Sequence, residues 1–133
     1  MSIGLILDTS ALLVHARLER LSAGELIGEV ADNGDLTGVP ALAVLDALPQ
    51  LKGHDRARLE QLVVGESHTI AILPLVADHL MEVDRVATLI PGGRGAAQAV
   101  VEANRYGVML ATVRPDELGI GVVIHEDDVG ALS

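Results

Sequence analysis

The chain has 133 residues, which suits one domain covering residues 1–133 and is too short for two. It has no cysteine, which excludes a thiol nucleophile, a zinc–thiolate site, an iron–sulfur centre and a disulfide framework. The net charge is −10 and Tyr106 is the only aromatic residue, which argues against a protein that grips nucleic acid through an unassisted basic face.

The N-terminal apolar run has no basic residues before it, and Asp8 interrupts it early, so we expect no signal peptide. No uncharged stretch approaches the roughly 18 residues of a membrane helix. We therefore expect a cytoplasmic protein without membrane contact.

The first half of the chain predicts two buried strands and three helices. The apolar run that ends at Asp8-Thr9-Ser10 has no helical period, and these three residues favour helix starts. Ser22 and Glu25 form a capping box, and Pro40 suits a first helical turn. The expected elements are a strand over Ile3–Leu7, a helix with Ala11, Leu12, Leu13, Ala16 and Leu21 inward, a helix from Ser22 to about Asp32, a strand over Leu36–Val39 and a helix over Ala41–Leu48.

The second half continues the alternation of helix and strand. Near-continuous apolar strands separated by helices are typical of α/β folds, in which helices cover both faces of a mainly parallel sheet. We predict about five mostly parallel strands in all. The expected elements are helices over His54–Val64, Val76–Thr88 (with Leu80, Val83 and Ala87 inward) and Ala96–Tyr106, a loop over Pro91–Gly95, and strands over Thr69–Leu73, Val108–Ala111 and Ile120–Ile124.

Two acids stand where a parallel sheet commonly binds ligands. Asp8 follows the first strand directly, and ligands bind outside the carboxyl ends of such strands. The same residue is an equally good helix cap. Asp46 interrupts the apolar helical run Ala41–Leu48, either as a functional group or as the position of that helix that faces water.

Three blocks of the sequence resemble the successive blocks of a PIN domain. They are Leu7-Asp8-Thr9-Ser10-Ala11-Leu12-Leu13, then Val39-Pro40-Ala41-Leu42 leading to Asp46, and Ala96–Gly107 leading to Thr112-Val113-Arg114-Pro115-Asp116-Glu117-Leu118. The resemblance covers nearly the whole chain, and its length and spacing are similar to small bacterial PIN proteins that act as ribonuclease toxins of toxin–antitoxin pairs. It implies a single PIN-like α/β domain, an RNA substrate, a basic antitoxin-like partner and a homodimer.

The family's chemistry implies about four acids that hold magnesium or manganese for phosphodiester hydrolysis. Oxygen ligands suit these hard cations, and the metal activates the attacking water. Asp8 matches the first acid, and Asp46 stands where the family usually has glutamate. On this interpretation Asp8 and Asp46 bind the metal, and Asp116 is recruited as a third catalytic acid.

The other two acid positions depart from the family pattern. The third acid is expected near Ala96, and the fourth is expected two residues after Thr112, where the chain has Arg114. Asp116 is the nearest replacement, although it also suits a turn or cap. Glu102 is nearly two helical turns from Ala96, about 9 Å of rise, and is not expected to reach the same metal.

The sequence therefore predicts a degenerate PIN-domain protein with an incomplete acidic metal site, weak or no nuclease activity, no cofactor, and a function exerted through protein contacts. The alternative is an active Mg- or Mn-dependent ribonuclease of the toxin–antitoxin type. We expect Asp8 and Asp46 to converge, and Arg114 to point toward them in place of the metal. Ser10 and Thr112 are expected either to hydrogen-bond a metal-bound water or phosphate, or to cap local structure.

Overall fold

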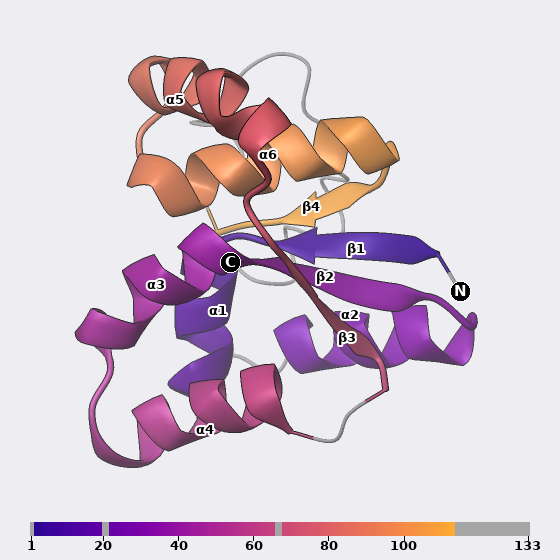
Figure 1. Ribbon diagram of the computed structural model, residues 1–133. Helices are drawn as coiled ribbons and strands as arrows, with labels where there is room; N and C mark the ends of the chain where they lie inside the picture. Colours follow the sequence, from indigo (N-terminus) through magenta and orange to yellow (C-terminus); the bar gives the residue numbers. More distant parts are fainter. Residues whose placement is uncertain (1, 20–21, 66–67, 114–133) are drawn as a thin grey trace.

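The computed structural model describes residues 2–19, 22–65 and 68–113. These residues form an α/β fold around one sheet whose four strands are all parallel, in the order β3-β2-β1-β4 (Figure 1). The prediction of a mostly parallel sheet is confirmed, with four strands where about five were expected. The strand predicted at Ile120–Ile124 lies outside the described residues. The four strands are β1 (Ile3–Leu7), β2 (Leu36–Pro40), β3 (Ile70–Leu73) and β4 (Met109–Ala111).

Helices cover both faces of the sheet, as predicted for parallel strands. Figure 1 shows α5 and α6 on one side and α1, α2 and α4 on the other, while α3 continues from the end of β2 and contacts α6. No helix of the described part is long and apolar enough to cross a membrane. The helices are α1 (Thr9–Ala16), α2 (Ser22–Asp32), α3 (Ala41–Ala47), α4 (Gly53–Val64), α5 (Leu80–Leu89) and α6 (Gly93–Tyr106), with short 3-10 helices η1 (Leu48–Gln50) and η2 (Ala77–His79).

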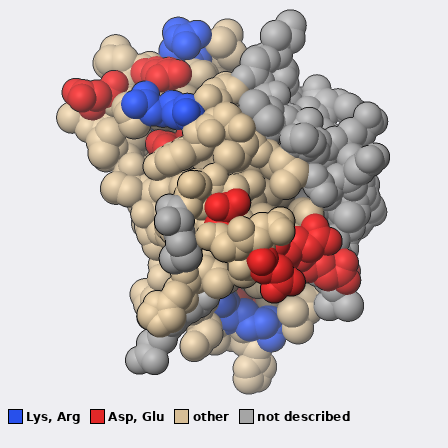
Figure 2. Space-filling view, turned by 90° about the vertical axis from the view of Figure 1, so that its right-hand side faces the viewer, with Lys and Arg blue, Asp and Glu red and all other residues tan. Residues whose placement is uncertain are grey.

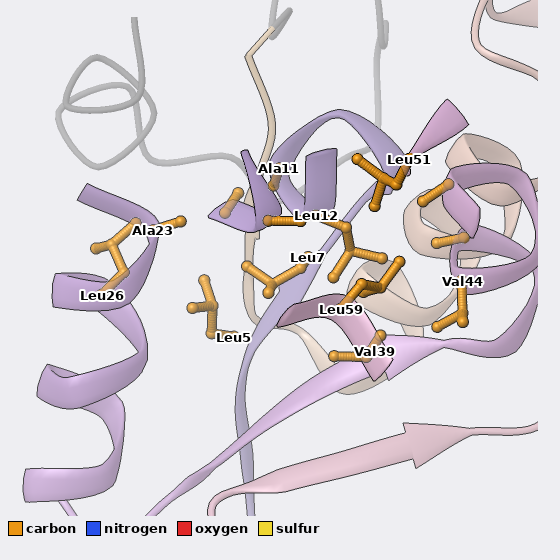
Figure 3. Close-up of a cluster of buried hydrophobic side chains, with 14 of the residues drawn as sticks. Leu5, Leu7, Ala11, Leu12, Ala23, Leu26, Val39, Val44, Leu51 and Leu59 are labelled. Atoms are coloured by element: carbon orange, nitrogen blue, oxygen red, sulfur yellow. The ribbon is translucent and has the colours of Figure 1, made fainter. Parts of the chain in front are cut away.

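Alternation of side chains along β1 builds the core on both faces of the sheet. Leu5 and Leu7 pack on one face, in the cluster drawn in Figure 3 with Leu12 and Leu59. Ile6 points to the opposite face, where it packs under α6. All three β1 side chains are fully buried, which holds the carboxyl end of this central strand in a fixed place.

Two helix boundaries differ from the sequence prediction. The loop predicted over Pro91–Gly95 is wrong in its last part, because α6 already begins at Gly93 after Gly92 takes a left-handed φ of 101°. The helix predicted over Val76–Thr88 is split into η2 and α5. Val83 is buried as expected, whereas Leu80, the first residue of α5, is 49% exposed.

Charged side chains do not form a continuous basic surface on the face seen in Figure 2, which turns the amino ends of the strands toward the viewer. Lys and Arg side chains lie in separate places at the top and bottom of this view, with acidic side chains between them. The described residues of this face do not provide the basic stripe that phosphate binding needs.

Candidate functional site

Asp8 lies at the carboxyl end of β1 and caps helix α1. Its backbone is extended, and its Oδ1 atom accepts a hydrogen bond of 2.9 Å from the Ala11 amide. The Ser10 hydroxyl donates a second hydrogen bond to the same oxygen at 2.6 Å. Since only 3% of Asp8 is exposed, this carboxyl group is held inside the protein rather than at its surface.

Residues at the ends of β1 and β4 meet because these strands are parallel neighbours. Leu7 pairs with Ala111, which brings Asp8 and Thr112 to adjacent places just beyond the sheet. The Ser10 and Thr112 hydroxyl oxygens lie 3.2 Å apart, and the Val113 amide donates to the Ser10 hydroxyl oxygen at 3.1 Å. The structure thus brings together Asp8, Ser10 and Thr112, three of the residues selected from the sequence.

Burial raises the pKa of the Asp8 carboxyl above its ordinary value of 3.8, because removal of water disfavours the charged form. Hydrogen bonds from Ser10, Thr112 and the Ala11 and Ser10 amides act in the opposite direction without cancelling the shift. A carboxyl group with a raised pKa in a buried position is a common feature of functional sites.

Asp46 lies on α3 and caps a different helix. Its Oδ2 atom accepts a 2.8 Å hydrogen bond from the amide of Gly95, the third residue of α6. A Cβ atom on Gly95 would lie 2.7 Å from Asp46 Oδ2 and would also press against the Thr9 hydroxyl. Asp46 and Thr9, the residue after Asp8, therefore both lie against Gly95. The Asp46 carboxylate is hydrogen-bonded to the first turn of α6.

A pocket of about 440 Å³ opens at this end of the sheet. Asp8, Ser10 and Thr112 line it, as does Ala96, the residue at the position predicted for the third acid. Asp46 does not belong to the lining. The methyl group of Ala96 thus stands where the resemblance would require a carboxylate.

The described residues do not fit a magnesium or manganese ion held by a cluster of acids. Of the described lining residues, Asp8 and Glu19 carry carboxylates, and Glu19 is at the exposed side, 3.8 Å from Arg17. Within residues 2–19, 22–65 and 68–113, no three His, Asp or Glu side chains gather as a metal site. Asp116 and Arg114 lie outside the described residues.

The late-helix acid Glu102 belongs to another part of the molecule. It is buried on α6 with its Oε1 atom 3.5 Å from His79 Nδ1, and it does not line the pocket. The sequence prediction that Glu102 would not join the site agrees with this placement.

Sequence reasoning missed the helical stripe that lines one wall of the pocket. Leu13, Val14 and Arg17 follow Ser10 along α1 and its end, three to seven residues on, which is the spacing of one helix face. Counting forward from Ser10 by helical turns would have found them. Gln50 and Pro91 come from distant parts of the chain and had no such signal.

No protein-family model matches the chain, and no curated protein matches it significantly.

Proposed function

We propose that this chain is a PIN-like domain with an incomplete acidic metal site, which has weak or no nuclease activity and acts through protein contacts. One observation carries the proposal: the two acids at the matched positions each cap a helix, Asp8 at α1 and Asp46 at α6. The Asp46 carboxylate that accepts the Gly95 amide is not part of the pocket lining, so the two matched acids do not line one pocket.

The chemistry of hydrolysis explains why an incomplete site matters. A divalent ion activates the attacking water and neutralises charge on the phosphate, and both effects depend on the ion being held in place. Ala96 offers no oxygen, and Asp46 lies outside the pocket lining. Among the residues that the structure describes, Asp8 alone is left as a buried carboxylate in the pocket.

Contacts with a partner are supported by apolar side chains left exposed around η2 and α5. Val76, Leu80 and Met81 are 41%, 49% and 78% exposed. Exposed apolar side chains that gather in one region commonly mark protein interfaces. The net charge of −10 favours a basic, antitoxin-like partner, and a homodimer is the second form of contact that we propose.

Nuclease activity is tested by incubating the purified protein with single-stranded RNA and millimolar manganese. We expect little or no cleavage above that of the buffer. Matched preparations of Asp8→Ala, Asp46→Ala and the surface variant Asp32→Ala control for contaminating nuclease. Cleavage that is lost in Asp8→Ala and Asp46→Ala but kept in Asp32→Ala would overturn the proposal and establish the metal-dependent ribonuclease instead.

A further inference from the structure

The hydrogen-bond donors that the described residues offer to the buried carboxyl group of Asp8 are all neutral. The Ser10 hydroxyl and the Ala11 amide both donate to Oδ1. Over the part of the chain that the structure describes, no basic side chain forms an ion pair with Asp8. A carboxylate removed from water and left without a cation is destabilising, and a bound cation would offset that cost.

Among the described residues, the basic side chain that lines the pocket is Arg17, and it is engaged elsewhere. Arg17 donates a 3.1 Å hydrogen bond to the Gln50 carbonyl oxygen and lies 3.8 Å from Glu19. These opposite charges largely neutralise one another at the exposed side. Counting only the part of the chain that the structure describes, the pocket therefore has a net negative charge at Asp8 when the carboxyl is ionised.

The rest of the lining suits a small organic molecule. Leu13, Val14 and Val113 provide apolar walls, and the Ser10 and Thr112 hydroxyls lie beside Asp8. The volume of about 440 Å³ falls within the roughly 300–1,000 Å³ of known small-molecule sites. A single buried carboxylate matches one positive charge better than the two charges of a metal ion.

We propose that this pocket binds a small organic monocation, an alkylguanidinium or alkylammonium, with its charged head at Asp8 and its apolar arm against Leu13 and Val14. A guanidinium fits best, because its planar set of donors can reach the carboxylate and a neighbouring hydroxyl together. This site goes beyond the proposed function, since it requires neither a protein partner nor the loss of nuclease activity.

Titration calorimetry with n-butylguanidinium tests the proposal, and the neutral n-butylurea serves as the matched ligand control. We expect one n-butylguanidinium per chain, with affinity at least about tenfold above that of n-butylurea. Asp8→Asn keeps an oxygen that can cap α1, and it should weaken n-butylguanidinium binding at least about tenfold. Glu102→Gln alters the other buried acid, which lies outside the pocket, and should leave the affinity unchanged.

A second variant separates the apolar wall from the charged base. Leu13→Ala should weaken binding of n-butylguanidinium while leaving methylguanidinium binding unchanged, because only the longer arm reaches Leu13. A general loss of structure would weaken both ligands.

Three results would overturn the inference: no binding by the wild type at millimolar n-butylguanidinium, equal binding of n-butylurea, or equal binding by Asp8→Asn. The first is expected if Arg114 supplies the cation internally, and it leaves the proposed function intact. Stoichiometric manganese binding would instead contradict the proposed function. The inferred cation site and the proposed function would therefore be refuted by different experiments.

Discussion

Replacing Asp46 tests whether this acid acts as a helix cap. Its Oδ2 atom accepts the Gly95 amide at 2.8 Å, and Gly95 is buried at the start of α6. In Asp46→Ala that amide loses its partner and cannot regain water fully. In Asp46→Asn the amide oxygen still accepts the hydrogen bond while the charge is removed.

The expected magnitudes follow from these contacts. Loss of a hydrogen bond to a charged group costs about 1.5–3 kcal/mol, and the better helix propensity of alanine on α3 returns about 0.5 kcal/mol. We therefore expect Asp46→Ala to lower the free energy of unfolding by about 1–2.5 kcal/mol, or the Tm by about 4–9 °C. Asp46→Asn should lose only the favourable charge–dipole interaction with α6, about 0.3–1 kcal/mol.

Urea unfolding followed by circular dichroism measures both variants, with the slope of the transition as the check that the unfolded states are comparable. The cap interpretation requires Asp46→Ala to be less stable than Asp46→Asn. It would be refuted if the two variants had equal stability, or if Asp46→Ala matched the wild type. If Asp46 were only a metal ligand, Asp46→Ala would be as stable as the wild type in metal-free buffer.

Three further predictions concern a helix contact and two titrating groups. Gly95→Ala should lower the free energy of unfolding, measured in urea, by about 1–3 kcal/mol, because its Cβ would lie 2.8 Å from the Ala43 Cα atom. The control Gly28→Ala should be neutral or stabilising, because a Cβ atom at Gly28 would meet no atom within 4 Å. Burial lowers the pKa of His15 from 6.5. Its contribution to the free energy of unfolding is therefore present above pH 6.5 and is lost as the pH falls through the folded-state pKa. The urea midpoints of the wild type and of His15→Gln should change relative to one another over that pH window. The pKa of Asp8 is shifted in the opposite direction, so its contribution to the free energy of unfolding is present below pH 3.8 and is lost as the pH rises through the folded-state pKa. Asp8→Asn should therefore be more stable than the wild type at neutral pH. A Tm advantage of Asp8→Asn that did not shrink in acid would contradict this prediction.

Local sequence patterns predicted most of the elements. Helix α2 spans Ser22–Asp32 as the capping box indicated, and β1 spans Ile3–Leu7 as the apolar run indicated. Both signals act between residues close in sequence, so they do not need the rest of the fold. The position of Asp8 at the end of β1 and the parallel sheet followed from the same kind of reasoning.

The early start of α6 was not predictable in this way. Its third residue, Gly95, is capped by Asp46, which is 49 residues away in the sequence. Gln98 shows the same dependence, since it is fully buried and bonds both the Leu42 amide and the Leu73 carbonyl oxygen. Neither residue carries a local pattern that identifies its partner.

The sequence by itself therefore determined the alternation of strands and helices and the apolar core. Only the tertiary structure decided that Asp46 caps α6 outside the pocket and that Leu13 and Arg17 line it. Periodicity and turn preferences depend on neighbouring residues along one chain segment. The partner of a side chain such as Asp46 depends on how separate segments pack, and that packing is set by the whole core.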